Sequence, residues 1–229
     1  MFEGKGRNAP AKILCRHLIL CEGEDEKQFL IAYLNSKERK AEDIRFGEAV
    51  QVENFGGNEE LKRGLAVTRR TPGFADLRTL LIIRDAERDA YIAEKEILTA
   101  LRTEEYAVPT EMGAWSQNGL PYTAYLLFPS LGKELENGTL EDLCMELIRE
   151  EYRPKQVMPR IAAFMNDLKD DGMRTYQHDF KSKIHSFFSV TDPFVGLKIG
   201  ESARAGAFDW NSKRLSRLNS CLMEGFNRD

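Results

Sequence analysis

The feature that most constrains the fold is a short run of consecutive apolar residues that ends abruptly in charged ones. Residues 77–83 end in four successive aliphatic side chains, and residues 84–89, which follow, are mostly charged. A continuous apolar run of this length is typical of a strand that is buried on both faces, as in a parallel sheet. The run therefore predicts an α/β domain in which helices cover both faces of a sheet.

The first two-thirds of the chain alternates between such runs and helical periodicity. Residues 13–21 form a second apolar run, and residues 24–36 carry apolar side chains at helical spacing with acidic residues in the first turn. Further strands are predicted around residues 49–53 and at residues 122–128, and a helix is predicted after Asp89. This order indicates βαβ units in a mostly parallel, Rossmann-like sheet flanked by helices.

The length of 229 residues suits one large domain with an extension. We expect a flexible polar tail at residues 1–12 and an α/β core at residues 13–150. Residues 151–229 are expected to form a helical extension that packs on the core as part of one domain. Inside the core, Thr139 and Asp142 have the spacing of a capping box, which predicts that a helix begins directly after Thr139.

Composition limits the cellular context and the kind of metal. Hydrophobic residues make up 42% and charged residues 31%, a balance typical of soluble globular proteins. No segment approaches the roughly 20 apolar residues of a membrane span, and no secretory signal is present. The four cysteines show no C-x-x-C spacing, which argues against a disulfide framework or a zinc site. We therefore expect a cytoplasmic protein without a membrane partner, in which oxygen atoms bind any metal.

The charge of the chain restricts how it could bind nucleic acid. A net charge of −4 argues against a broad basic surface, because phosphate binding depends on Lys and Arg. Contact with nucleic acid would therefore be local. Each basic cluster taken alone also fits a solvated helix face; the clusters are Arg69 with Arg70, Lys181 with Lys183, and Lys213 with Arg214 and Arg217.

Acidic residues follow two of the predicted strands at the point where each strand ends. Glu22 follows the first apolar run and Asp85 follows the run at residues 77–83. The carboxyl ends of parallel strands meet at one edge of a sheet, so both residues are expected beside one crevice. Glu87 lies two residues beyond Asp85, and in an extended chain its side chain would point to the same side. Asp25 and Glu26, one turn before the inward face of the next helix, are auxiliary candidates.

Such a cluster of carboxylates predicts a divalent cation. Two carboxylates about 4 Å apart repel each other by roughly 1 kcal/mol in water and by several kcal/mol at the effective dielectric of a protein surface. A bound Mg²⁺ would remove this cost, because it prefers oxygen ligands and is usually shared between one or two carboxylates and a substrate phosphate. Mn²⁺ is the alternative ion. The alternative for each acidic residue taken alone is that it is a solvated loop residue or interacts with the dipole of a helix.

Residues 18–26 and 82–87 resemble the two signature motifs of Toprim domains, which are a strand that ends in Glu-Gly and a strand that ends in Asp-x-Asp. Topoisomerases, DnaG-type primases, recombination nucleases and OLD-type nucleases share this domain. The chain more closely resembles a family of small prokaryotic Toprim-like proteins. Further matches to their pattern are Gly56-Gly57, Phe128-Pro129, Leu140-Glu141-Asp142, Lys181-x-x-x-His185 and a glycine-containing stretch up to Phe226.

The resemblance implies that Glu22 is a general acid or base and that Asp85 and Glu87 are magnesium ligands. Glu87 replaces the second Asp of the motif, and Glu26 stands where an Asp is usual. The longer side chains keep the charge and can still reach a cation, with looser geometry.

Lys181 and His185 would share one face of a helix if their segment is helical. In a functional interpretation, Lys181 would neutralise charge on a pentavalent phosphate, and His185 would bind phosphate or relay a proton. The alternative is that both residues lie on the solvated face of an amphipathic helix. On the functional interpretation, Lys181 and His185 are candidate catalytic residues together with Glu22.

Three functional hypotheses follow from these patterns. The first and leading hypothesis is Mg²⁺-dependent phosphoryl transfer in the form of phosphodiester hydrolysis of DNA or RNA. The second is a non-catalytic module that uses the Toprim scaffold to bind a protein or a nucleotide. The third is hydrolysis of a small nucleotide or phosphorylated metabolite, which suits a negatively charged protein. The expected partners are nucleic acid or a nucleotide, and either a partner protein or a second copy of the chain.

Overall fold

A parallel sheet forms the centre of the molecule. The computed structural model describes residues 12–36, 48–116, 119–131, 134–152, 157–170 and 179–228, so the predicted tail lies almost entirely outside the described residues. The sheet has four parallel strands in the order β2-β1-β3-β4. Their bounds are β1 His17–Cys21, β2 Val50–Asn54, β3 Thr79–Asp85 and β4 Tyr122–Phe128. The predicted α/β class with a Rossmann-like parallel sheet is confirmed.

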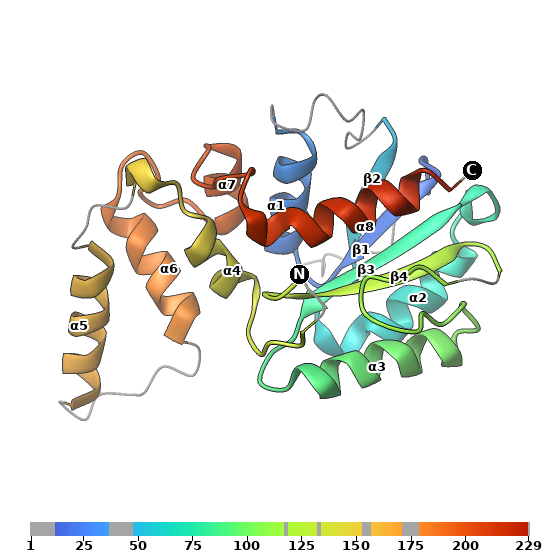
Figure 1. Cartoon of the computed structure of the whole chain (residues 1–229), viewed down its shortest axis with the longest axis horizontal. Coiled ribbons are helices and arrows are strands. Elements are labelled where there is room, and N and C mark those ends of the chain that lie inside the picture. Colours follow the sequence, from blue (N-terminus) through green and yellow to red (C-terminus); the bar gives the residue numbers. More distant parts are fainter. Residues whose placement is uncertain are drawn as a thin grey trace, which may run out of the picture.

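Helices cover both faces of this sheet. The helices that connect the strands are α1 (Glu24–Leu34), α2 (Leu61–Arg70) and α3 (Ala90–Thr103). Figure 1 shows α2 and α3 on one face, and α1 with α8 (Ser216–Phe226) on the other. As predicted, a helix starts after Asp89, whose carboxylate accepts hydrogen bonds from the N–H groups of Tyr91 and Ile92 at 3.0 and 3.1 Å. Every residue of β3 is buried, which explains its continuous apolar sequence.

The order of the strands gives the sheet a topological switch point at the carboxyl ends of β1 and β3, the edge that we call the crevice. From β1 the chain crosses to β2 on one side, whereas from β3 it crosses to β4 on the other side. Because β1 and β3 are neighbours, the loops that leave their carboxyl ends diverge. Such a switch in direction is where open α/β sheets place their ligands.

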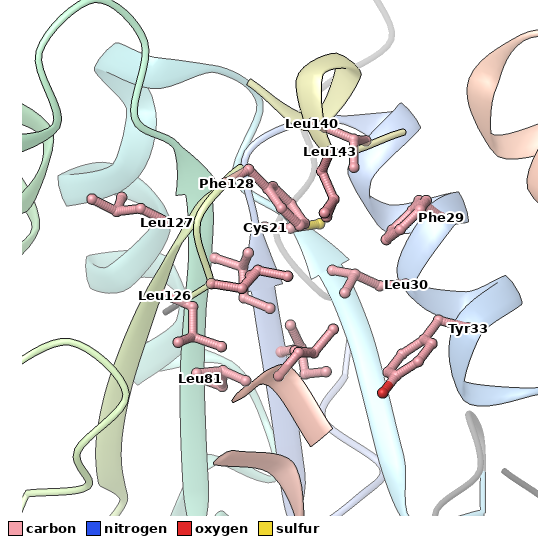
Figure 2. Close-up of a cluster of buried hydrophobic side chains, with 14 of the residues drawn as sticks. Cys21, Phe29, Leu30, Tyr33, Leu81, Leu126, Leu127, Phe128, Leu140 and Leu143 are labelled. Carbon is pink, nitrogen blue, oxygen red and sulfur yellow. The ribbon is translucent and has the colours of Figure 1, made fainter. Parts of the chain in front are cut away.

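Apolar side chains form the floor beneath this crevice. Figure 2 shows the α1 side chains pointing toward the sheet, and two side chains of α4 (Leu140–Leu147) next to the ends of β1 and β4. The predicted capping interaction of α4 is present, since the Asp142 carboxylate accepts a hydrogen bond from the Thr139 N–H at 2.7 Å. The floor residues, all nearly inaccessible to solvent, include Phe29, Leu30, Tyr33, Cys21, Phe128, Leu140 and Leu143.

The last third of the chain is helical and contacts the core at several places. Its helices in the described residues are α5 (Val157–Asp170), α6 (Asp179–Val190), α7 (Ile199–Arg204) and α8. Helix α6 packs between α4 and α5, so α5 lies farthest from the sheet (Figure 1). Helix α7 packs on α1. Helix α8 crosses a face of the sheet, where the Trp115 indole N–H donates a hydrogen bond to the Cys221 carbonyl at 3.0 Å.

Three strands have different bounds from those predicted. Strand β2 (Val50–Asn54) is shifted by one residue, and β3 starts at Thr79 instead of residue 77. Strand β1 begins at His17, because Leu14 is exposed and its N–H donates to the Gln51 side chain at 2.8 Å instead of to a neighbouring strand. Strand β3 continues through Arg84 and Asp85, which still pair with β4. Asp85 is therefore the last residue of the strand. No helix in the described ranges is long and apolar enough to cross a membrane.

Candidate active site

The turn that follows β2 fixes the position of Glu22 at the end of β1. The N–H groups of Gly56 and Gly57 donate hydrogen bonds to the Glu22 carbonyl at 3.1 and 3.0 Å. Both glycines have positive φ angles, of 90° and 120°, which a residue without Cβ adopts easily. The Gly-Gly turn therefore holds the Glu22 backbone beside β3, where the Glu22 carboxylate lies near the Asp85 backbone.

A buried arginine lies behind the Glu22 carboxylate. The Arg84 side chain is 1% exposed, with Nε 3.8 Å from Glu22 Oε2 and Nη1 3.0 Å from Glu96 Oε2 on α3. Glu22 Oε2 is buried and has no hydrogen-bond partner among the described residues. Burial raises the pKa of Glu22, and the charge of Arg84 offsets part of this effect. Glu22 thus has a buried oxygen that can accept a proton or bind a cation. Sequence reasoning assigned no role to Arg84.

Asp85 joins the end of β3 to the start of α4. The residue is 7% exposed, and its Oδ1 accepts a hydrogen bond from the N–H of Leu140 at 2.9 Å. This N–H belongs to the first residue of α4, where the positive end of the helix dipole favours an anion. Burial nevertheless raises the pKa of Asp85 well above its ordinary value, and the carboxylates of Glu26 and Glu22 raise it further.

Glu26, which the sequence indicated as an auxiliary candidate, lies in the same acidic cluster as Glu22 and Asp85. Its carboxylate folds back over the start of α1, and Oε2 lies 2.7 Å from the position that a Cβ on Gly23 would take. The missing side chain of Gly23 therefore gives the carboxylate its room. Burial, followed by the nearby charges of Glu22 and Glu141, raises the pKa of Glu26 to about 7.

Glu141 is a member of the cluster that sequence reasoning did not assign to the site. It lies in the first turn of α4, is 5% exposed, and its Oε1 is 3.2 Å from Lys181 Nζ. Its charge contributes to the raised pKa values of Asp85 and Glu26. A glutamate in the first turn of a helix is usually explained by its favourable interaction with the helix dipole. In the sequence, only the match of Leu140-Glu141-Asp142 to the Toprim-like pattern indicated Glu141.

Glu87 reaches the crevice by a different route from the one predicted. Its φ angle is +56°, and its N–H and carbonyl pair with Gly138 at 2.8 and 2.7 Å. The chain has therefore left the extended conformation, and the argument that Asp85 and Glu87 point to one side as alternate strand residues is wrong. Glu87 still lies close enough for its charge to raise the pKa of Glu22.

Lys181 and His185 both lie on α6 but have different surroundings. The Lys181 side chain is 59% exposed and pairs with Glu141. Burial lowers the pKa of Lys181, but the carboxylates of Glu141 and Glu26 raise it more. The His185 carbonyl accepts a hydrogen bond from Ser189, and within the described ranges the imidazole makes no hydrogen bond or ion pair with the acidic residues. The structure thus brings Lys181, but not His185, into contact with the cluster.

The cluster suits a hydrated magnesium ion better than a metal enclosed by side chains. In the part of the chain that the structure describes, no three His, Cys, Asp or Glu side chains are arranged around one point that could hold a metal ion. The donors are nevertheless hard carboxylate oxygens, and Glu22 Oε2 lacks a hydrogen-bond partner there. Mg²⁺ usually keeps several waters and needs only one or two carboxylates, so Glu22 and Asp85 fit it, with Glu26 and Glu141 nearby.

Comparisons with known proteins give one match. A family model described as "Protein of unknown function (DUF3226)" matches residues 16–227. The matched region includes all the acidic residues of the cluster and Lys181. No curated protein matches the chain, and no solved structure matches it.

Proposed function

Since the chain belongs to the DUF3226 family, whose description names no activity, we propose a function from the acidic crevice itself. The proposed reaction is Mg²⁺-dependent hydrolysis of phosphodiester bonds in nucleic acid, at a site of the Toprim type. The observation that carries the proposal is the grouping of buried carboxylates where the loops from β1 and β3 diverge. Burial and mutual repulsion raise the pKa values of Glu22, Glu26 and Asp85 together. A divalent cation would remove that repulsion.

Glu22 is the residue that we assign to proton transfer. Its raised pKa brings its protonation closer to neutral pH, as general acid–base catalysis requires. Its buried Oε2 can accept a proton from an attacking water, while the glycine turn fixes its backbone. The positive charge of Arg84, whose Nε is 3.8 Å from Glu22 Oε2, attracts the carboxylate and so favours its observed position. Arg84 is thus a positioning residue.

Asp85 and Glu22 are assigned to binding the cation, with Glu26 and Glu87 as further candidate ligands. One oxygen of Asp85 is held by the Leu140 N–H, which orients the carboxylate and leaves the second oxygen for the ion. When bound, Mg²⁺ polarises the phosphate and stabilises the leaving oxygen. Mn²⁺ has the same preference for oxygen ligands and is expected to substitute.

Lys181 and His185 are assigned to interact with the substrate phosphate. Lys181 is more than half exposed, so its ammonium group can reach a phosphate and neutralise charge that develops during the reaction. His185 lies one turn further along α6, and its proposed role is to bind phosphate or relay a proton.

The net charge of −4 argues against a broad basic surface, so the proposed contact with nucleic acid is local. All four cysteines are free thiols, which supports a cytoplasmic location.

The test is a nuclease assay with supercoiled plasmid and single-stranded oligonucleotides in Mg²⁺ or Mn²⁺. Glu22→Gln and Asp85→Asn are each expected to lower the rate by about 100-fold or more, because each removes a charge that the reaction uses. Glu105→Gln, which alters a glutamate with an 82% exposed side chain that pairs with Arg69, should leave the rate unchanged. Intact substrate with both ions, or full activity in Glu22→Gln, would contradict the proposal.

Two further measurements, competition by nucleotides and binding of the ions, would distinguish the other hypotheses. Inhibition by mononucleotides but not by DNA would indicate a small phosphorylated substrate. A folded protein without affinity for either ion would indicate a non-catalytic binding module.

A further inference from the structure

The ion pair between Lys181 and Glu141 joins two very differently exposed side chains. Lys181 Nζ lies 3.2 Å from Glu141 Oε1, and the side chains are 59% and 7% exposed. The buried carboxylate of Glu141 cannot leave the crevice without moving α4, whereas the long lysine side chain can turn toward solvent. Lys181 is therefore the mobile partner of the pair.

The docking of α6 does not depend on this ion pair. Ile184, Phe187 and Phe188 lie on the inner side of the helix and are almost completely buried. The aromatic ring of Phe188 also packs against the rings of Phe194 and Phe208. These apolar contacts hold α6 beside α4, so the Lys181 ammonium group can move while the helix stays in place.

We propose that Lys181 and a divalent cation compete for the carboxylates of the crevice, an inference that rests on the proposed function. The ammonium group and the ion are both positive, and Lys181, which pairs with Glu141, also lies within the influence of Glu26 and Asp85, two of the candidate ligands of the ion. Because both would lie in the same small cluster, the two positive charges repel each other, and binding of one weakens binding of the other. The coupling is reciprocal, and an ion that enters the crevice displaces Lys181 from Glu141.

The competition would serve the proposed reaction in two ways. In the absence of an ion, Lys181 offsets part of the repulsion within the cluster and so helps to keep Glu141 and its neighbours in place. Once the ion takes over this role, the released ammonium group lies at the rim, where a substrate phosphate enters. The same side chain would then act on the phosphate only when the metal is bound.

The first experiment is a calorimetric titration with Mg²⁺ and with Mn²⁺ at pH 8 on the full chain. Lys181→Ala should bind the ions about tenfold more tightly than the wild type, because it lacks the competing charge. Lys181→Arg keeps the charge and should stay close to the wild type. Lys183→Ala is the matched control; this lysine lies two positions further along α6, so it projects from another side of the helix, and its removal should leave the affinity unchanged.

Equal or weaker ion binding by Lys181→Ala would overturn the inference, and a lower Tm in that variant would then assign the ion pair to docking of α6. The outcome is separable from the test of the proposed function. If Lys181→Ala binds ions more tightly but the wild type cleaves no nucleic acid, only the proposed function fails. If the wild type is an active nuclease and Lys181→Ala binds ions no more tightly, only the competition fails.

A second measurement uses the wild-type protein, so it does not depend on how a variant folds. The rate at which an amine-acylating reagent modifies each lysine is followed by mass spectrometry, with and without saturating Mg²⁺. Release from Glu141 should make Lys181 react several-fold faster when the ion is present, whereas Lys183 should react at the same rate. An unchanged or slower rate at Lys181 would contradict the competition.

Discussion

Several acidic residues in the crevice lie in surroundings that disfavour a negative charge. Glu22, Glu26 and Asp85 each have a pKa raised first by burial and then by their acidic neighbours. Their few fixed partners are backbone N–H groups and Arg84, which weaken the effect without removing it. The cluster is therefore destabilising when ionised, and any cation that binds there gains affinity from the relief of repulsion.

The pH dependence of stability should reveal Glu26. Its pKa is about 7 in the folded protein and near 4.5 when the side chain is free, so the folded state keeps its proton to a higher pH. The stability that this proton provides is fully present below pH 4.5 and is lost as the pH rises to 7. Glu26→Gln should therefore be more stable than the wild type by about 1 to 3 kcal/mol at pH 8, and similar to it at pH 4.5.

Chemical denaturation at both pH values measures this difference. Glu105→Gln, which changes a solvent-exposed glutamate, serves as the control and should show no gain at pH 8. A Glu26→Gln variant that is equally stable or less stable than the wild type at pH 8 would show that the burial of the Glu26 charge is not costly.

At the scale of elements, helix α4 does the most to assemble the site. Its first N–H holds Asp85, its first turn contributes Glu141, and its apolar face packs over the ends of β1 and β4 (Figure 2). The Asp142 cap fixes where this helix begins. A shift of the helix start would move Glu141 and the N–H group that holds Asp85 together.

Removing the cap of α4 should therefore affect metal binding as well as stability. Asp142→Ala is expected to cost about 1 kcal/mol, or a Tm decrease of about 2–4 °C, and to weaken Mg²⁺ binding in calorimetry. Asp89→Ala removes the N-cap side chain of α3, another capping interaction at a helix start, and should lower Tm by a similar amount without changing the affinity. Equal effects of the two variants on Mg²⁺ affinity would refute a special role for α4.

The elements that sequence reasoning located well are those with an unambiguous local pattern. The strand at residues 122–128 matches β4 exactly in its bounds, because a polar segment precedes it and Pro129 follows it. The start of β1 was misplaced because Ile13 and Leu14 are as apolar as strand residues, although Leu14 is exposed. Apolar content alone does not show which residues pair with a neighbouring strand.

The site was only partly predictable for a related reason. Glu22 and Asp85 directly end strands, so the sheet topology alone brings them together. Glu141 comes from a helix far along the chain, and nothing in its local sequence shows that the helix begins at this sheet edge. The conformation of Glu87 was missed because the backbone turns immediately after Asp85 to pair with Gly138, a contact between distant segments.

At the scale of the whole molecule, ion binding to the crevice should stabilise the entire fold. The acidic residues come from β3, α1, α4 and the loop after β1, and unfolding would separate all of them. An ion present at ten times its Kd adds about 1.4 kcal/mol, which corresponds to an increase in Tm of about 3–6 °C. The increase should be larger at pH 8 than at pH 6, since protons compete for Glu26.

Differential scanning fluorimetry with MgCl₂, and with KCl at the same ionic strength, tests this expectation. Asp85→Asn should lose most of the increase. An equal increase with KCl would attribute the effect to general screening rather than to a bound ion.

The position of α8 has a consequence for biosynthesis. This helix lies against the sheet near the start of β1, where the ring of Phe226 is 4.5 Å from that of His17, although the two residues are among the first and the last of the described chain. A nascent chain emerging from the ribosome therefore leaves this apolar surface uncovered until residues 216–226 have been translated. Until then the surface is open to chaperones and to other unfinished chains.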